Sequence, residues 1–243
     1  MTKLNFANRR TKKENDVTQE LEKLLQKNNS SEILKSPFNY LPRQTVTSML
    51  TRIDLFRMIE NINGSIVECG THRCNSTFLY YHLSSIIEPY NYNRKIIGFD
   101  TFEGIKNLSK KDQKKGLNKF SDSNYDLYLK LAKIHDKNRS VSHIEKMELI
   151  KGDAKKTIPK YIKQNPQLII ALLYLDFSSY VPTKIALKHL LPLVAKGGIV
   201  CADKLNCSDW QGETIAFKEE IKLNKVKLKK FKYDTWVSYF VVE

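Results

Sequence analysis

Acidic residues end five successive apolar segments of this sequence: Glu68, Asp100, Asp153, Asp176 and Asp203. Each apolar segment predicts a buried strand, and the amphipathic segments between them predict helices. The carboxyl ends of parallel strands meet at one edge of a sheet, where doubly wound folds bind their ligands. A single aspartate at such a place is also explained by its preference for turns and helix N-caps. Five together predict a functional site at this edge.

The first two of these strand ends favour a nucleoside cofactor. An apolar run leads into Glu68-Cys69-Gly70, and a second apolar run ends about thirty residues later at Asp100. A carboxylate in the second position accepts hydrogen bonds from ribose hydroxyls in doubly wound folds. The turn is not GxGxxG, because Cys74-Asn75 stands where further glycines would admit a pyrophosphate. A cofactor with a ribose and no pyrophosphate fits better, which favours S-adenosylmethionine (SAM).

Asp176 and Asp203 end consecutive predicted strands and could act on the substrate that accepts the methyl group of SAM. Asp176 follows the apolar run LIIALLYL, so its carboxylate is partly desolvated. Such a group has a raised proton affinity and suits a general base, or else it needs a cation beside it. Neighbouring strands lie about 4.8 Å apart. Two carboxylates at so short a distance repel each other unless a proton or a metal lies between them. Mg²⁺ would resolve this repulsion; alternatively, Asp203 only caps a loop and Lys204 neutralises it.

From residue 65 onward, predicted strands alternate with predicted helices and position these residues. We expect strands at 65–69, 95–99, 147–151, 168–175, 198–202, 226–232 and 236–242. We expect helices at 75–88, 155–164, 182–194 and 211–223. The last two strands are separated by Tyr233-Asp234-Thr235 and predict an antiparallel hairpin. The sequence therefore predicts an α/β fold, Rossmann-like and doubly wound, with a mostly parallel seven-stranded sheet and a C-terminal antiparallel hairpin.

Two other segments complete the predicted organisation. Residues 1–50 are expected to form an N-terminal arm and capping helices, with Thr45 able to cap a helix that ends near Asn63-Gly64. Residues 51–243 are expected to form the SAM-binding domain. Within it, the long polar segment 100–146 predicts one or two helices and is long enough to cover the site as a lid.

Composition excludes some classes of function. The chain has 243 residues and a formal net charge of +15, but its lysines are spread along the sequence. Asn and Ile are also abundant, so coding bias explains the charge best; an anionic small substrate is an alternative. Nucleic acid is an unlikely partner because no arginine-rich arm with interleaved aromatic residues is present. No apolar run approaches the eighteen residues of a membrane span.

Cysteine usage and the N-terminal sequence favour a cytoplasmic protein. The four cysteines form no CxxC pair, which is typical of reduced core thiols. The charged N-terminus is not followed by the apolar segment of a secretory signal. The N-terminal helix and the closing hairpin are surfaces through which two copies could associate as a homo-oligomer.

Six landmarks, in order, resemble those of a known family. They are YLPRQT, GSIVECGTHR, IIGFDTFEGI, KGDAKKTIP, LLYLDFSSYVPTKIALKHLLPLVAKGGIVCAD and DWQGETIAF, which run from about Tyr40 to Phe217. This combination is similar to the macrocin O-methyltransferase (TylF-like) family of class I SAM-dependent methyltransferases. Members of that family mostly methylate sugar hydroxyls in natural products and glycans. The resemblance implies a class I methyltransferase fold and SAM as the cofactor.

The resemblance also implies roles for individual residues. On the cofactor side, Glu68, Gly70 and Thr71 would line the methionine and ribose, Asp100 would hold the ribose, Thr101 and Phe102 would flank the adenine, and Asp153 would lie near its edge. On the acceptor side, Asp176 would be a metal ligand with a general-base role open to it, Asp203 a second metal ligand, and Lys204 and Trp210 would contact the acceptor.

The chain departs from the family pattern at the expected metal site. The family commonly has DxD where this chain has Asp176-Phe177-Ser178, and Asp-Asp where it has Asp203-Lys204. Two carboxylates are therefore missing and one position carries a cation. An ammonium group there could replace part of the metal's charge, polarising the acceptor or holding an anionic group.

These observations predict a SAM-dependent O-methyltransferase that acts on a sugar or a related small polyhydroxy acceptor, with Mg²⁺ as a candidate cofactor. A methyltransferase that acts on a phosphorylated carrier or on nucleic acid is one alternative. The other is a non-catalytic SAM-binding scaffold, which the missing carboxylates favour.

Overall fold

A computed structural model describes residues 12–27, 30–106, 108–113, 118–121 and 123–243 of the chain. These residues divide into two compact units, residues 1–50 and residues 51–243, and the boundary falls within helix α3 (Arg43–Met58). The first unit also contains α1 (Lys12–Lys27), α2 (Ser30–Lys35) and the 3-10 helix η1 (Pro37–Tyr40). Helix α3 begins directly after Pro42, so Thr45 lies in its first turn and does not cap it.

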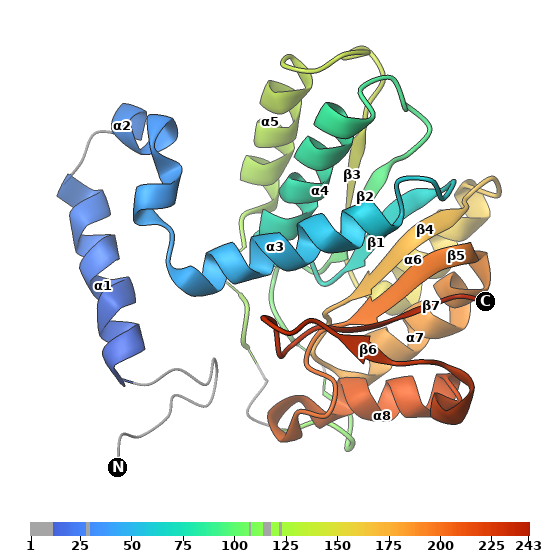
Figure 1. The fold of residues 1–243 in the computed structure, drawn as a ribbon. Coiled ribbons are helices and arrows are strands. Elements are labelled where there is room, and N and C mark those ends of the chain that lie inside the picture. Colours follow the sequence, from blue (N-terminus) through green and yellow to red (C-terminus); the bar gives the residue numbers. More distant parts are fainter. Residues whose placement is uncertain (1–11, 28–29, 107, 114–117, 122) are drawn as a thin grey trace. The chain divides into compact units, whose positions relative to one another are not determined.

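The second unit contains a seven-stranded sheet (Figure 1). Its strands are β1 (Ser65–Cys69), β2 (Ile96–Asp100), β3 (Met147–Lys151), β4 (Ile170–Leu175), β5 (Val194–Ala202), β6 (Lys229–Lys230) and β7 (Ser238–Val241). The strand order is β3-β2-β1-β4-β5-β7-β6, with β1 to β5 parallel and β7 antiparallel to both of its neighbours. The predicted fold class, including the closing hairpin, is confirmed.

Helices cover both faces of this sheet. They are α4 (Asn75–Ile87), α5 (Tyr125–Asp136), α6 (Ala154–Gln164), α7 (Tyr180–Leu190) and α8 (Gln211–Glu220). Apolar side chains of α3, α4 and α5 pack on one face, and those of α6, α7 and α8 pack on the other. Because successive strand residues point to opposite faces, the fully buried strands β1 and β4 contribute to both cores.

Several element boundaries differ from the predicted ones, and for two of them the physical reason is identifiable. Helix α7 ends at Leu190 and not at residue 194, because Pro192 cannot continue a helix and a short 3-10 turn follows. Strand β6 is reduced to Lys229 and Lys230, whereas seven residues were predicted. Both lysines are exposed at the edge of the sheet, where charged side chains oppose further strand pairing.

Helix α5 lies within the segment 100–146 that was predicted to form a lid. Its Tyr128 and Ala132 are buried in the core beside β3 and α4. This part of the segment therefore contributes to the fold itself, and the loop that follows it leads to the amino end of β3, away from the carboxyl ends of the strands.

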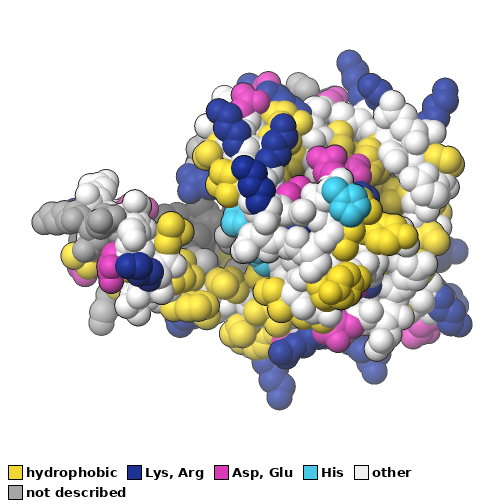
Figure 2. All heavy atoms as spheres, turned by 90° about the horizontal axis from the view of Figure 1, so that it is seen from above, with side chains coloured by type: hydrophobic (Ala, Val, Ile, Leu, Met, Phe, Trp, Pro, Cys, Tyr) yellow, Lys and Arg dark blue, Asp and Glu magenta, His cyan; other side chains and the backbone are white. Residues whose placement is uncertain are grey.

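Membrane-spanning helices and basic patches are the two features that bear on the expected partners. Among the described residues, no helix is long and apolar enough to cross a membrane. Lysine and arginine side chains lie at several places on the face shown in Figure 2, and some of them lie close together at the upper left of the main body.

Candidate active site

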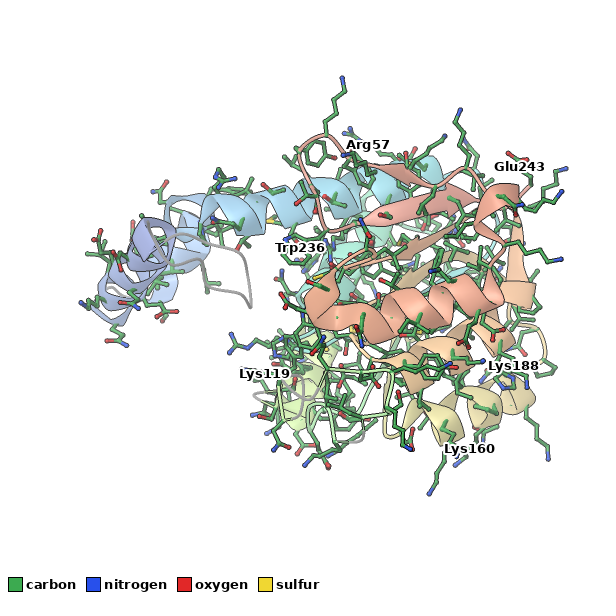
Figure 3. All side chains as sticks on the ribbon, turned by 90° about the horizontal axis from the view of Figure 1, so that it is seen from below. Arg57, Lys119, Lys160, Lys188, Trp236 and Glu243 are labelled. Carbon is green, nitrogen blue, oxygen red and sulfur yellow. The ribbon has the colours of Figure 1, made fainter. Side chains whose placement is uncertain are left out.

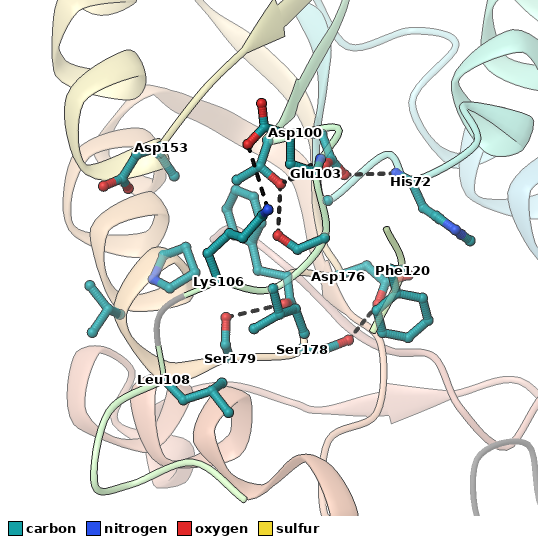
Figure 4. A pocket seen from close by; sticks show the side chains of 18 of the residues that line it. His72, Asp100, Glu103, Lys106, Leu108, Phe120, Asp153, Asp176, Ser178 and Ser179 are labelled. Carbon is teal, nitrogen blue, oxygen red and sulfur yellow. Dashed lines mark hydrogen bonds and ion pairs between the residues drawn. The ribbon is translucent and has the colours of Figure 1, made fainter. Parts of the chain in front are cut away.

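A cavity of about 530 Å³ lies at the carboxyl ends of the parallel strands (Figure 4). Its lining comes from the residues after all five parallel strands, from the loop after β2, and from the start of α7. Six predicted site residues line it: Gly70, Asp100, Thr101, Asp153, Asp176 and Lys204. Helix α8 packs beside α7, whose first residues line the cavity (Figure 3). The topology thus brings residues far apart in sequence to one cavity.

Five predicted site residues lie outside this lining: Glu68, Thr71, Phe102, Asp203 and Trp210. Phe102 has a left-handed backbone (φ 54°), and its ring packs on Tyr125 at a centroid distance of 4.9 Å, in the core. Trp210 lies behind Phe120, whose ring lines the cavity 5.6 Å from it. Phe120, which the sequence analysis missed, thus lines the cavity and contacts Trp210.

Asp100 joins the two turns that flank the cavity. Its carboxylate accepts hydrogen bonds from the backbone N–H groups of His72 and Phe102, both at 2.7 Å. Burial raises the pKa of Asp100, and these two hydrogen bonds offset part of that effect. Each carboxylate oxygen has a second lone pair. Asp100 can therefore hold both turns and still accept hydrogen bonds from a ligand in the cavity.

Asp153 follows β3 and also has a local role. It is the N-cap of α6, and its Oδ1 accepts a hydrogen bond from the backbone N–H of Lys155 at 2.9 Å. This bond satisfies one of the free N–H groups at the start of the helix. The side chain lines the cavity at the same time, so a capping role and a ligand-binding role are compatible here.

Glu68 lies inside β1 and is almost fully buried. Its two carboxylate oxygens accept hydrogen bonds from the hydroxyl groups of Ser76 and Thr77, at the start of α4. Burial raises its pKa to about 7, although both hydroxyl groups favour the charged form. Glu68 therefore connects β1 to the helix behind the first turn, and it does not face the cavity as the resemblance implied.

The raised pKa of Glu68 predicts a pH-dependent stability. Its folded-state pKa of about 7 exceeds the ordinary value of 4.5, so protonated Glu68 stabilises the fold below pH 4.5 and this contribution is lost as the pH rises through 7. We expect Glu68→Gln to raise the free energy of unfolding at pH 8 by about 1–3 kcal/mol, with a smaller gain at pH 5. Urea unfolding at both pH values measures this. A gain of equal size at the two pH values would contradict it.

Asp176 and Asp203 lie side by side at the ends of β4 and β5. The backbone N–H of Asp203 donates to the carbonyl of Leu175 at 2.8 Å, which aligns the two strand ends. Between the carboxylates lies the ammonium group of Lys204. It donates to Oδ1 of Asp176 and lies 4.0 Å from Oδ1 of Asp203. Burial raises the pKa of Asp176, and the positive charge of Lys204 lowers it in part.

The residues around this pair do not fit a divalent cation. Mg²⁺ takes oxygen ligands in a near-octahedral arrangement. Within the residues that the structure describes, no group of three or more acidic, histidine or cysteine side chains could hold a metal ion. The place between the two predicted ligands is taken by Lys204. We therefore derive no catalytic step through a metal.

Glu213, in α8, is a further buried carboxyl that the sequence analysis did not single out. Its Oε2 accepts a hydrogen bond from the backbone N–H of Ser178 at 2.7 Å, which holds the turn after Asp176. Burial and the nearby charge of Asp176 raise its pKa well above the ordinary value. The sequence signal that could have identified Glu213 as a site residue was its position in the landmark DWQGETIAF.

Part of the loop after β2 is bound to α7 and α8. Asp112 accepts hydrogen bonds from the backbone N–H of Tyr180 and of Ser109, both at 2.8 Å. The carbonyl of Lys111 accepts one from the side chain of Gln211 at 3.1 Å. Because Ser109 also lines the cavity, this short segment forms part of the wall on that side.

Comparison with known proteins identifies the family. The sequence profile of the macrocin-O-methyltransferase (TylF) family matches residues 42–241. The chain belongs to this family. It is therefore a SAM-dependent O-methyltransferase, and the resemblance inferred from the six landmarks is confirmed. No curated protein matches the chain.

Solved structures of other methyltransferases are similar to this chain over most of their length. The crystal structure of CalS11, a calicheamicin methyltransferase, has 29% sequence identity and a TM-score of 0.91 over 99% of this chain and 98% of that chain. The apo structure of CalS11, described as a TDP-rhamnose 3′-O-methyltransferase, has 30% identity and a TM-score of 0.84 over 96% and 95%. The O-methyltransferase NovP shares the fold, with 18% identity and a TM-score of 0.64 over 79% of each chain.

Proposed function

We propose that this enzyme methylates a hydroxyl group of a sugar, and that a nucleotide-linked sugar such as TDP-rhamnose is the class of acceptor to test first. The observation that carries the proposal is that Asp100 and Asp176 line one cavity from the ends of β2 and β4. A ribose at Asp100 leaves the remainder of the cavity, with Asp176, for the acceptor. The similarity to CalS11 supports a sugar acceptor.

The described residues fit SAM. Gly70 lines the cavity, Asp100 presents acceptor lone pairs to it, and Thr101 and Asp153 belong to the same wall. We propose that Asp100 holds the ribose hydroxyls and that Asp153 lies near the adenine edge. When bound, SAM would supply a methyl group on a sulfonium, and S-adenosylhomocysteine would be the leaving group when that methyl passes to an acceptor oxygen.

Asp176 and Lys204 provide the acid–base chemistry at the acceptor end. As the acceptor oxygen forms its bond to the methyl carbon, the bond from that carbon to sulfur breaks and its electron pair stays on sulfur. The hydroxyl proton passes to the carboxylate of Asp176, which acts as general base. The ammonium group of Lys204 stabilises the negative charge that develops on the acceptor oxygen. No covalent intermediate with the protein is needed.

The lining near Asp176 suits a sugar ring. Phe120 presents an aromatic face to the cavity, and His72 packs against its edge at a centroid distance of 5.2 Å. Polar groups of Ser178 and Lys204 lie in the same part of the lining. An apolar ring with a few convergent polar groups is typical of small-molecule sites. The divalent metal suggested by the family pattern is not part of this proposal.

The role of Asp100 can be tested by binding of S-adenosylhomocysteine (SAH). We expect Asp100→Asn to weaken the affinity by about 10- to 100-fold, because hydrogen bonds to a charged group contribute about 1.5–3 kcal/mol. Calorimetric titration measures this, with Asp126→Asn, the same change at an exposed position of α5, as the control. An affinity unchanged in Asp100→Asn would contradict the assignment of the ribose site.

The acceptor class needs a separate measurement. Incubation with SAM and TDP-rhamnose, followed by mass spectrometry, is expected to show a product heavier by one methyl group. If SAH binds and no nucleotide sugar is methylated, the sugar proposal fails while the cofactor site stands. If the wild type does not bind SAH, the cofactor assignment itself fails.

A further inference from the structure

A lysine lies where the family pattern places a carboxylate for a metal, between two strand-end carboxylates. We propose that the ammonium group of Lys204 is the resident cation of the acceptor centre, and that this centre takes no divalent metal. The inference rests on the proposed function, because it concerns the residues assigned to the acceptor. It is nevertheless separable from that function, since metal binding can be measured without turnover.

The requirement for a cation comes from the sheet. Strands β4 and β5 are parallel neighbours with Leu175 opposite Ala202, so the next residue of each strand, Asp176 and Asp203, reaches the same edge. Both side chains are largely removed from water, with exposed fractions of 25% and 11%. Two carboxylates in this position repel each other unless positive charge lies close to both.

Lys204 supplies that charge from a fixed position. Its Nζ contacts Asp176 and lies 4.0 Å from Oδ1 of Asp203. The backbone is held as well, because its N–H donates to the carbonyl of Trp236 at 2.9 Å. The side chain is only 15% exposed, yet it lines the cavity, with Nζ 5.9 Å from the centroid of Phe120. The ammonium group therefore faces the carboxylates and the acceptor space together.

A second cation faces the other oxygen of Asp203. The Arg52 guanidinium lies 3.7 Å from Oδ2 of Asp203 and above the ring of Tyr174, at 4.7 Å from its centroid. The Tyr174 hydroxyl donates to the same oxygen at 3.3 Å. Both oxygens of Asp203 thus already face positive or donor groups. A divalent ion coordinated by Asp203 would lie beside two cations, which opposes its binding.

Glu213 does not complete a metal site with these two aspartates. Its Oε2 accepts from the backbone N–H of Ser178, its Oε1 is buried without a hydrogen-bond partner, and Lys204 is a nearby cation for it as it is for the aspartates. The described part of the chain contains no set of three ligating side chains. Lys204 and Arg52 are therefore the cations beside Asp176 and Asp203.

Substitution of Lys204 by aspartate replaces the cation of the site with a third carboxylate, and this provides the test. Lys204 has a left-handed backbone (φ 61°), which Asp and Asn adopt more readily than Lys, so the backbone accommodates either. Lys204→Asp adds a third carboxylate and removes the ammonium group. Lys204→Asn removes the ammonium group without adding charge, and so it is the matched control.

Binding of Mn²⁺, a paramagnetic probe for Mg²⁺ sites, can be followed by electron paramagnetic resonance on the full chain. We expect no Mn²⁺ binding in the millimolar range for the wild type or for Lys204→Asn. For Lys204→Asp we expect one Mn²⁺ per chain, which a further Asp203→Asn change removes. Calorimetry with SAH on the same samples reports separately on the cofactor site of the proposed function.

Two results would overturn the inference. One is Mn²⁺ binding by the wild type that Asp203→Asn abolishes, because the centre would then accept a metal beside Lys204. The other is a folded Lys204→Asp variant that binds no Mn²⁺, because position 204 would then not be a cation position. If Lys204→Asp does not fold, the wild-type titration and its Asp203→Asn counterpart still decide the question. Absence of SAH binding, by contrast, counts against the proposed function alone.

Discussion

Asp176→Asn is expected to lower kcat by about 10²- to 10⁴-fold, the range typical of losing a general base. The asparagine keeps an oxygen that can accept the hydrogen bond from Lys204, but it cannot take the proton of the acceptor hydroxyl. Affinity for SAH is expected to stay within about threefold of the wild type, because the ribose end of the cavity is unchanged. Steady-state kinetics with a confirmed acceptor and SAH calorimetry measure the two effects.

A matched control for this prediction lies in the same cavity. Asp153→Asn makes the same chemical change at the end of β3, on the side assigned to adenine. It is expected to change SAH affinity more than kcat. If Asp176→Asn retained a kcat close to that of the wild type, Asp176 would not be the base, and another group or solvent would have to take the proton.

Gly70→Ala is expected to destabilise the second unit by about 2–5 kcal/mol and to abolish SAH binding. Gly70 has φ +93°, where a side chain is strained. A Cβ there would lie 2.3 Å from the carbonyl oxygen of Asp176 and 2.6 Å from its carbon. Both atoms are backbone, and the N–H of Asp176 is itself bonded to the carbonyl of Cys69 at 2.7 Å. The end of β4 must therefore move, which displaces the proposed base.

Gly152→Ala separates backbone strain from this close approach. Gly152 also has positive φ (+137°), but a Cβ there would meet only the methyl group of Thr157, at 3.0 Å. We expect it to cost at least about 1 kcal/mol less than Gly70→Ala. Urea unfolding of both variants is the measurement. Equal losses would show that strain at positive φ, and not contact between β1 and β4, explains the requirement for Gly70.

The succession of strands along the chain and the strand ends that carry chemistry were predictable because their signals are local. Hydrophobic alternation and Gly turns mark β1 and β3 with the bounds that the structure shows, and the carboxyl ends of parallel strands must share an edge. For this reason Asp100 and Asp176 could be assigned to one site before any coordinates. The family landmarks added the cofactor and the reaction, since periodicity alone does not distinguish SAM from other ribosides.

Which side chains face the cavity was decided by tertiary contacts. Glu68 was expected to line it, but the pleat of β1 turns its carboxyl toward the hydroxyl groups of α4. The left-handed turn at Phe102 and the fit of its ring against Tyr125 remove it from the cavity, and Phe120 takes the place expected of Trp210. These outcomes depend on loop paths and on packing between segments far apart in sequence.

The sequence alone determined that this chain has a doubly wound fold with carboxylates at one edge, and its landmarks indicated a methyltransferase, because apolar runs, alternation and motif order are properties of neighbouring residues. It also placed a lysine directly after Asp203. Only the tertiary structure decided that Lys204 lies against Asp176 as well, and that Arg52 of α3 faces Asp203 from the other side. The net charge around a buried group is the sum over every element packed against it, so it exists only once those elements are assembled.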